Sequence, residues 1–528
     1  MSSILDFWPI ESPPRPNQVK ALEWLEQQED TKYIILEAPV GSGKSLIGLT
    51  YSRYLSNKKG DAFILTPQRI LQQQYERTLS DRSLASLYGK NNYPCSQKNT
   101  TCDIGSIVKP KCSGCKFSHA FTAAKKAPNT VFNYKLALLL FGYTKAFHAQ
   151  RSLMVLDECH TVEEHLTEFN AITVNHRRAE RYGVKWKTKT TIPSALKWIK
   201  EEYMPKASDF LTKLFEKVKP LLDKAEDEEL TRAELKQFAD YNRHESHLDD
   251  LAEFLCNPLE QIKDEFVLVH DKETMKFKQL TGAKNFRTML DPRAGQFLFM
   301  SSTILNYKGF CKDLGIDPSQ AAYLSIESDF PVENRPVIYL PQMKMNASWN
   351  KPENKKNREK MLAAVLKLLE HHKNESGIIH TGNFQIARWL VDELMLAAPQ
   401  HIVHHNPDSG DDRNEIINMF TNAKKPIVLI SPSITEGLDL KDDMARFAIF
   451  AKVPFGFLGD QWIKRRLEMS QEWYQRRALI NVIQGGGRVV RSQKDWGNVY
   501  ILDASWAYLY SQTKNMIPKW WRDSYQIL

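Results

Sequence analysis

Two series of short apolar runs, separated by patterns typical of helices, divide the chain of 528 residues. Each run is bounded by glycine, proline or polar residues, as expected for strands buried on both faces of a parallel sheet. The expected strands are Tyr33–Ala38, Ala62–Thr66, Leu153–Leu156 and Phe297–Met300 in the first series, and Val337–Leu340, Gly377–His380, Ile427–Ile430, Ala448–Ala451 and Val499–Leu502 in the second. We therefore predict an α/β protein with two doubly wound parallel-sheet domains.

Two segments of different character interrupt the first series. Residues 85–128 are rich in lysine and cysteine, whereas residues 161–261 repeat apolar residues at the spacing of helices. We expect both segments to be insertions into the first α/β domain. The predicted division assigns 1–84, 129–160 and 262–330 to the first α/β domain and 331–528 to the second.

A glycine-rich stretch follows the first expected strand and precedes a helical pattern. It reads Ala38-Pro-Val-Gly-Ser-Gly-Lys-Ser45, and glycines at such a turn let backbone N–H groups approach phosphate oxygens. Lys44 can reach the β- and γ-phosphates of a nucleotide, and Ser45 can ligate Mg²⁺. The expected phosphate-binding residues are Gly41, Ser42, Gly43, Lys44 and Ser45.

Two further elements complete an expected ATPase site. Asp157 and Glu158 follow an apolar strand, at the sheet edge where α/β proteins place ligands. Asp157 can hold Mg²⁺, and Glu158 can deprotonate the attacking water. Near the C-terminus, Arg488 and Arg491 are three residues apart, on one face of a helix, and can meet the charge that develops on a transferred phosphoryl group.

Four of the seven cysteines lie within residues 95–115. They are Cys95, Cys102, Cys112 and Cys115, and four thiolates in one short loop satisfy either a 4Fe–4S cluster or a tetrahedral Zn²⁺ ion. The spacing alone leaves both metals open. Seven cysteines are too few for a disulfide scaffold of this size.

The net charge of +9 is concentrated in the same segment. Its seven lysines against one aspartate are interleaved with aromatic residues, a combination suited to backbone phosphates and stacked bases. The residues expected to contact a nucleic acid here are Tyr93, Lys109 and Lys111. Trp462 and Trp473 are further candidates for contact with bases, but large aromatic residues more often belong to the core.

The order of these motifs resembles that of the superfamily 2 helicases of the XPD/DinG type. The likeness covers nearly the whole chain. The motifs that carry it are Arg15-Pro-Asn-Gln18, Ala38–Ser45, Thr66–Gln74, Asn133-Tyr134, Asp157-Glu-Cys-His160, Ser301-Ser-Thr303, Phe330-Pro-Val-Glu-Asn-Arg335, Ser431-Pro-Ser with Glu436-Gly-Leu-Asp439, and Gln484-Gly-Gly-Gly-Arg-Val-Val-Arg491. Cys159 and Ser302 depart from the commoner residues of the family.

The resemblance implies two RecA-like motor domains, a cysteine-bound 4Fe–4S domain at 85–128 and a helical arch at 161–261. It implies ATP- and Mg²⁺-dependent translocation on single-stranded DNA, 5′→3′, with unwinding of forked duplex. It adds Arg15 and Gln18 as readers of adenine, Gln484 as a sensor of the γ-phosphate, and Glu436, Gly437 and Asp439 as further nucleotide contacts. The implied DNA contacts are Thr66, Gln72, Asn133, Tyr134 and Ser431.

Alternative functions remain open at this point. One is a translocase that displaces proteins or RNA–DNA hybrids without unwinding duplex; another is a DNA-bound ATPase switch. We expect a monomer. We also expect no membrane contact, because no run of about 18 apolar residues occurs. We also expect an intracellular, cytoplasmic location (the host cytoplasm for a viral protein). The sequence does not indicate the biological pathway, and DNA repair is one of several that stay open.

Overall fold

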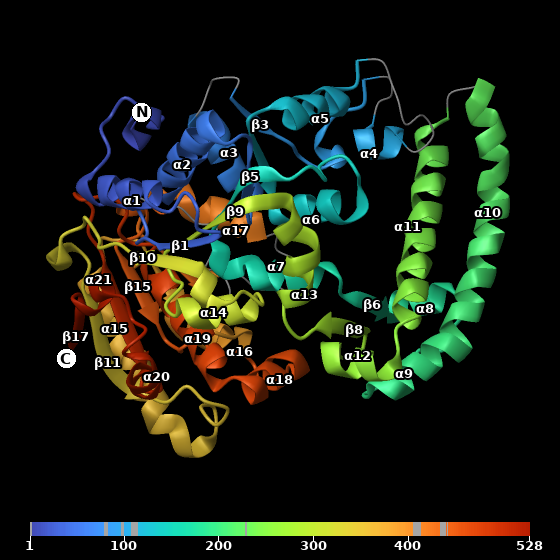
Figure 1. The fold of residues 1–528 in the computed structure, drawn as a ribbon. Coiled ribbons are helices and arrows are strands. Elements are labelled where there is room, and N and C mark those ends of the chain that lie inside the picture. The colour runs from blue at the N-terminus through green and yellow to red at the C-terminus, as the bar shows by residue number, and fades with distance from the viewer. Residues whose placement is uncertain are drawn as a thin grey trace.

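The computed structural model describes residues 3–78, 83–96, 100–106, 114–227, 230–404, 413–432, 440 and 442–528. Two seven-stranded sheets form its body, and both are parallel throughout. In Figure 1 the first sheet lies above the second, with the insertions on the right. The two predicted doubly wound sheets are therefore present.

The first sheet has the strand order β10-β1-β9-β5-β2-β4-β3. Its strands are β1 (Tyr33–Glu37), β2 (Ala62–Thr66), β3 (Leu84–Ser86), β4 (Asn129–Asn133), β5 (Arg151–Asp157), β9 (Ala294–Ser301) and β10 (Ala321–Ser325). Its helices are α1 (Pro16–Glu26), α2 (Lys44–Lys58), α3 (Arg69–Thr78), α6 (Tyr134–Tyr143), α7 (Val162–Phe169), α13 (Ala283–Asn285) and α14 (Tyr307–Asp313). All residues of β1 and β2 are buried, which explains their unbroken apolar sequences.

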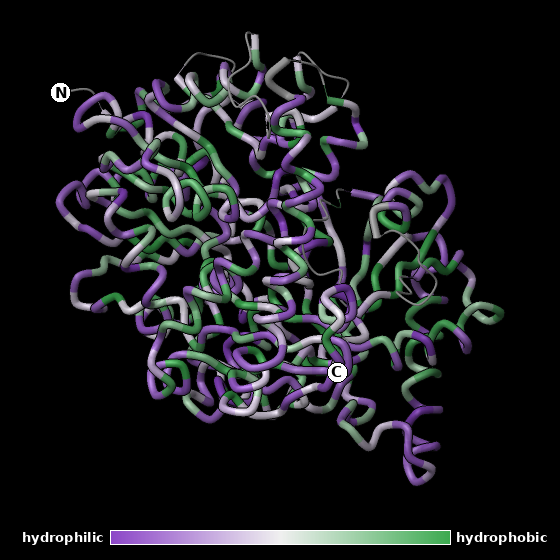
Figure 2. The backbone as a smooth tube through the Cα atoms, turned by 90° about the vertical axis from the view of Figure 1, so that its right-hand side faces the viewer, coloured by the Kyte–Doolittle hydropathy of each residue, from purple (hydrophilic) through white to green (hydrophobic). Residues whose placement is uncertain are grey.

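The second sheet has the order β13-β14-β12-β15-β16-β11-β17. Its strands are β11 (Val337–Met343), β12 (Gly377–His380), β13 (His401–His404), β14 (Ile427–Ser431), β15 (Phe447–Phe450), β16 (Asn498–Asp503) and β17 (Tyr525–Ile527). Its helices are α15 (Lys355–His371), α16 (Phe384–Leu394), α17 (Arg413–Thr421), α18 (Gln461–Met469), α19 (Gln471–Gly486), α20 (Trp506–Thr513) and α21 (Lys519–Arg522). Figure 2 shows the hydrophobic stretches mainly inside this body and many hydrophilic ones at its outside.

The helical insertion stands on a small antiparallel sheet. Its strands β6 (Ile172–Asn175), β7 (Phe266–His270) and β8 (Thr274–Gln279) pair in the order β6-β8-β7. Between β6 and β7 lie α8 (His176–Arg181), α9 (Ile192–Trp198), α10 (Met204–Asp227), α11 (Arg232–Leu255) and α12 (Leu259–Glu265). This pairing groups residues 266–279 with the helices, although the predicted domain boundaries assign them to the first motor domain.

The long helices α10 and α11 lie side by side, away from both motor sheets (Figure 1). The cysteine-rich segment contributes α4 (Cys102–Gly105) and α5 (Lys116–Lys126). The helices α10 and α11 form a hairpin with a small apolar cluster of Val218, Leu230, Leu235 and Phe238, and Ile104 of α4 packs against this cluster. The far end of the hairpin is thus in contact with the cysteine-rich segment. Among the described residues, no helix has the length and apolar character needed to cross a lipid bilayer.

Candidate nucleotide site

The glycine-rich loop joins β1 to α2 with two residues in the left-handed region. Gly41 and Gly43 both have φ +77°. A Cβ atom on Gly41 would lie 2.5 Å from the ring of Phe330, and one on Gly43 would lie 2.4 Å from Nε2 of Gln18. Both backbone conformation and close packing therefore require glycine at these positions.

The loop and the acidic pair meet as the sequence predicted. Lys44 Nζ lies 3.7 Å from Glu158 Oε1. Ser45 Oγ donates a hydrogen bond of 3.0 Å to Asp157 Oδ2. A lysine, a hydroxyl and two carboxylates thus converge at the carboxyl ends of β1 and β5, a donor set that suits a Mg²⁺-bound triphosphate.

Two buried tyrosines hold Asp157. Tyr75 OH donates to Asp157 Oδ2 over 2.8 Å, and Tyr134 OH donates to the Asp157 carbonyl over 2.7 Å. Tyr134 was expected at the DNA, but its side chain lies 1% exposed under the nucleotide site. No local sequence signal marks Tyr75, because its partner is 82 residues away.

The pKa values of the two carboxylates are shifted in opposite directions. Burial, reinforced by the charge of Glu158, raises the pKa of Asp157 above its ordinary value. Burial alone would also raise the pKa of Glu158, but surrounding positive charge lowers it below its ordinary value. The groups that supply this charge are Lys44, His160, Arg488 and Arg491. The lowered pKa keeps Glu158 ionised, as a general base must be. Its backbone is left-handed, with φ +49°, a strained conformation for a residue with a side chain.

Gln484 connects the two motor domains beside this site. It is buried at the end of α19, and its Nε2 donates to Ser302 Oγ over 2.9 Å and to Thr303 Oγ1 over 2.8 Å. Nearby, His160 Nδ1 hydrogen-bonds Ser301 Oγ at 2.8 Å. The Asp157–His160 motif, the Ser301–Thr303 strand end and the second motor domain are therefore linked by hydrogen bonds.

Arg15 and Gln18 lie against the phosphate loop. Gln18 Nε2 donates to the Ser42 carbonyl over 2.9 Å, and Arg15 Nη2 donates to the Gly41 carbonyl over 2.8 Å. The structure thus brings the two expected adenine readers to the loop itself.

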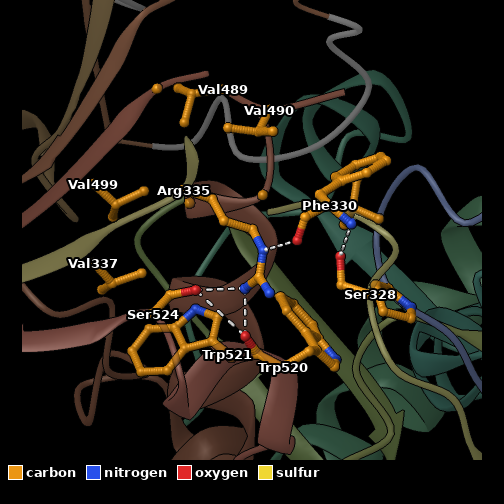
Figure 3. Close-up of a pocket in the computed structure, with 15 residues that line it drawn as sticks. Ser328, Phe330, Arg335, Val337, Val489, Val490, Val499, Trp520, Trp521 and Ser524 are labelled. Carbon is orange, nitrogen blue, oxygen red and sulfur yellow. Dashed lines mark hydrogen bonds between the residues drawn. The ribbon is translucent and has the colours of Figure 1, made fainter. Parts of the chain in front are cut away.

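A small apolar cavity separates the phosphate loop from the second motor domain. It has a volume of about 40 Å³ and is lined by Val40, Val489, Val490 and Trp520 among others. In Figure 3 Arg335 points toward Trp520 and Ser524, and its Nε donates to the Phe330 carbonyl over 3.1 Å. The cavity holds a few water molecules at most and is too small for a nucleobase.

The residues expected to contact DNA differ in how deeply they are buried. Gln72 is buried, and its amide donates to the carbonyls of Leu87 and Val131 at 2.9 and 3.2 Å. Asn133 caps α6 by accepting from the Leu136 N–H, and Thr66 and Ser431 are buried at strand ends. Tyr93 is half-buried, its ring centroid 5.5 Å from that of Phe117. The predicted residues Lys109, Lys111, Glu436, Gly437 and Asp439 lie outside the described residues.

Three of the four clustered cysteines are described, and two of them touch. Cys102 Sγ and Cys115 Sγ are 3.8 Å apart, and both residues are buried. Cys95 Sγ would lie 2.7 Å from a Cβ on Gly105, so it too faces α4. Cys112 lies outside the described residues, and within them no three metal-ligating side chains gather closely enough to hold an ion.

A buried ionic cluster, which sequence reasoning missed, joins α18 and α19 to the first motor domain. We call it the interdomain clasp and define it as Glu163, Asp313, Arg466, Trp473 and Arg476. Arg466 Nη2 lies 2.7 Å from Glu163 Oε1 and 2.8 Å from Asp313 Oδ1, and Trp473 Nε1 donates to Glu163 Oε2 over 2.9 Å. Arg476 also pairs with Asp313.

The clasp continues into the helical insertion. Trp462 of α18 donates from Nε1 to the carbonyl of Gln279 in β8 over 2.7 Å, and the Lys278 ammonium lies 4.1 Å from its ring centroid. Trp462 and Trp473 are 3% and 2% exposed, so both tryptophans belong to the core. First motor domain, second motor domain and insertion therefore meet at one buried junction.

Comparisons with known proteins agree with this architecture. The family described as "Helicase C-terminal domain" matches residues 345–524, and "Type III restriction enzyme, res subunit" matches residues 11–184. The ATP-dependent DNA helicase YoaA of Escherichia coli is 23% identical over 242 residues, which are 44% of this chain and 36% of that protein. The ATP-dependent DNA helicase DinG of Photobacterium profundum is 24% identical over 231 residues, 41% of this chain and 32% of that protein.

Solved structures agree in fold. "XPD_Helicase" superposes with a TM-score of 0.63 at 16% identity, covering 97% of this chain and 99% of the other. "Structure of S. tokodaii Xpd4" gives a TM-score of 0.58 at 11% identity, covering 97% of this chain and 100% of the other. The chain spans about a third of the length of the curated relatives it matches. The matched families, the relatives and the fold are thus those of superfamily 2 helicases of the XPD/DinG type, to which this chain is similar.

Proposed function

We propose that this protein is an ATP-dependent DNA helicase that moves on single-stranded DNA and unwinds duplex. The observation that carries the proposal is the convergence of both motor domains on one site. Lys44 and Glu158 of the first domain lie 3.7 Å apart, while Arg488 and Arg491 of the second domain lower the pKa of Glu158. Hydrolysis that depends on residues of both domains changes with their relative position, which is what converts ATP turnover into motion.

Each residue of the site has a definite proposed role. Lys44 binds the β- and γ-phosphates, with the backbone of Gly41, Ser42 and Gly43 around them. Ser45 and Asp157 would hold Mg²⁺, which neutralises phosphate charge when bound. Glu158 takes the proton of the attacking water. Gln484, Arg488 and Arg491 sense and stabilise the γ-phosphate from the second domain.

Replacing Glu158 tests this assignment. Glu158→Gln removes the base but keeps the size of the side chain, so DNA-stimulated hydrolysis should fall by about 10² or more while nucleotide binding persists. Phosphate release and fluorescent-nucleotide binding measure the two quantities. Glu23→Gln, on the exposed face of α1, is the matched control. Full hydrolysis in the Glu158 variant would refute the role.

We further propose that Cys95, Cys102, Cys112 and Cys115 bind a metal group that stiffens a DNA-contacting segment at the fork. The resemblance favours 4Fe–4S. The 3.8 Å between Cys102 and Cys115 Sγ fits the edge of a tetrahedral site with Zn–S bonds of about 2.3 Å as well as the contact of two free thiols, so Zn²⁺ is kept as the alternative. A 4Fe–4S cube would require these thiols to move apart. Iron and zinc assays together with the visible spectrum of anaerobically purified protein separate the two.

The substrate proposal is single-stranded and forked DNA, with 5′→3′ movement, by a monomer. A forked duplex with either a 5′ or a 3′ tail tests polarity and mechanism together. Unwinding from the 5′ tail supports a helicase of that polarity. Displacement of a bound protein or of an RNA–DNA hybrid without duplex unwinding would favour the remodelling translocase, and bound but static DNA the ATPase switch.

A further inference from the structure

The carboxylate of Glu37, the last residue of β1, is buried and accepts hydrogen bonds from two successive backbone N–H groups. Its Oε1 accepts from Ile304 N–H over 2.7 Å and from Leu305 N–H over 2.8 Å, and its Oε2 accepts from the Tyr323 hydroxyl. Glu37 is 2% exposed, and a carboxylate so deeply buried requires such donors. The strand that leads into the phosphate loop is thus fastened by one side chain to the segment that follows β9.

The two N–H groups belong to a turn of uncommon conformation. Leu305 has φ +63°, and the Asn306 N–H donates to the Ile304 carbonyl over 2.7 Å. A hydrogen bond that spans two residues around a residue of positive φ defines a strained γ-turn, which a leucine adopts only where its surroundings impose it. Glu37 imposes it here, because its Oε1 binds the N–H groups of both Ile304 and Leu305.

The turn directs its two apolar side chains into different domains. Ile304 is 1% exposed and belongs to the buried apolar cluster of the first motor domain. Leu305 is 7% exposed and belongs to the cluster of the second motor domain, together with Leu479 and Val489. Reversal of side-chain direction within two residues follows from the left-handed conformation, so the turn is what places Leu305 in the second domain.

The residues before the turn contact the same two parts of the molecule. The Ala38 N–H, at the start of the phosphate loop, donates to the Ser301 carbonyl over 2.9 Å. Gln484 of the second motor domain donates to Ser302 and Thr303 at 2.9 and 2.8 Å. The segment after β9 therefore lies between the phosphate loop and the second domain, with polar contacts first and the apolar contact at its end.

We propose that Glu37 is a positioning residue for ATP hydrolysis: by holding Leu305 in its left-handed conformation, it keeps the phosphate-loop strand attached to the second motor domain. This inference deepens the proposed ATPase function and rests on it. Hydrolysis requires Arg488 and Arg491 of the second domain to be in place, whereas nucleotide binding depends mainly on the phosphate loop. Loss of the attachment should therefore lower kcat more than nucleotide affinity.

Replacing Glu37 tests its hold on the turn. In Glu37→Ala both N–H groups lose their acceptor, so kcat at saturating single-stranded DNA should fall about tenfold, while the Kd of a fluorescent ATP analogue stays near the wild-type value. Glu37→Gln keeps an oxygen that accepts from both N–H groups, so it should retain most of the wild-type kcat. Equal losses in the two variants, or a change confined to Kd, would overturn the inference.

Leu305 provides a second and independent test. Leu305→Ala shortens the side chain in the second-domain cluster, and Leu314→Ala makes the same change at a buried position of the first-domain cluster, as the matched control. We expect kcat to fall about tenfold in Leu305→Ala and to stay near the wild-type value in the control. Because Glu37 acts through Leu305, Glu37→Ala should cause little further loss in the Leu305→Ala background. Multiplied losses, or equal kcat values in Leu305→Ala and its control, would overturn the inference.

Measurements on the wild-type protein separate the two kinds of failure. Absence of DNA-stimulated ATP hydrolysis in the wild type would refute the proposed function itself, whereas normal wild-type hydrolysis with unaffected variants overturns only the role of Glu37. Thermal denaturation sets a temperature at which the compared variants are folded. If Glu37→Ala does not fold, Glu37→Gln and Leu305→Ala with its control still decide the outcome.

Discussion

At the scale of single residues, Asp157 shows how a carboxylate is prepared for a cation. Ser45 and Tyr75 donate to its Oδ2, and Tyr134 fixes its carbonyl. Burial and Glu158 raise the pKa of this carboxyl, while the hydrogen bond from Tyr75 acts against them. The tyrosine hydroxyl therefore helps to keep Asp157 ionised and able to bind Mg²⁺.

Removal of that hydroxyl should weaken the binding of Mg²⁺ in a pH-sensitive manner. In Tyr75→Phe the pKa of Asp157 rises further, so protons compete more strongly with Mg²⁺. A hydrogen bond to a charged group is worth about 1.5–3 kcal/mol, which corresponds to roughly tenfold or more in Mg²⁺ affinity. Mg²⁺ titrations of ATP hydrolysis at acidic and alkaline pH measure the effect, which should be larger at the acidic pH.

Tyr51→Phe is the matched control for this prediction. Tyr51 is equally buried on α2, but its hydroxyl donates to Gln296 at 2.7 Å, away from Asp157. A Mg²⁺ dependence that is the same in both variants would contradict the role of Tyr75.

At the scale of elements, the interdomain clasp fixes α18 and α19 of the second motor domain against the first motor domain. Arg466 is 3% exposed and contacts both Glu163 and Asp313. Loss of one member of a buried ion pair leaves the others charged in a medium of low dielectric. We expect Arg466→Ala to lower the free energy of unfolding by about 3–5 kcal/mol.

Urea denaturation measures that loss, and the adjacent residue supplies the control. Arg465 pairs only with Glu468 on the same helix among the interactions described, at 3.1 Å, and its side chain is 56% exposed. Because exposed pairs contribute about 0–1 kcal/mol, Arg465→Ala should leave the midpoint nearly unchanged. Equal stability of the two variants would show that the clasp contributes little.

The clasp should also make stability depend on pH. Burial and the charge of Asp313 raise the pKa of Glu163 to about 7, although Arg466 and Arg477 oppose them. An acid with a raised pKa in the folded state favours folding while protonated. Its stabilisation is therefore complete below about pH 4.5, its ordinary value, and is lost as the pH rises to about 7. Glu163→Gln cannot ionise, so the stability difference between it and the wild type should change across this window and stay constant above it.

Most of the strands that sequence analysis missed share one position. The strands β10, β3, β13 and β17 are the outer strands of their sheets, and β4 lies next to β3. Outer strands are covered less completely, so they need no unbroken apolar run, and β13 begins and ends with histidine. The inner strands of both seven-stranded sheets were all predicted except β4, which is mostly buried but begins and ends with asparagine. Edge strands cannot be found from that signal.

At the scale of the whole molecule, the same distinction applies to the site. Lys44, Ser45, Asp157 and Glu158 were predictable because each follows a strand whose end lies at the shared sheet edge. Tyr75, Glu163 and Arg466 were not, because their roles arise from contacts between distant segments with no local pattern. The expected DNA residues Gln72 and Tyr134 turned out to support the interior, since polar side chains near a motif serve backbone groups as readily as ligands.

The position of β1 has a consequence for how the protein is made. Its two neighbours, β9 and β10, begin at Ala294 and Ala321, roughly 260 residues or more after β1 ends, because both insertions intervene. At a synthesis rate of about 5–20 residues per second, the strand that carries the phosphate loop waits about 13 s or longer for a partner. A nascent chain arrested with residues 1–290 exposed should be cleaved readily by protease near β1 and bind no ATP, whereas one with residues 1–330 exposed should resist cleavage there. Nucleotide binding by this chain is thus expected only once β9 and β10 have been made, long after the phosphate loop itself is translated.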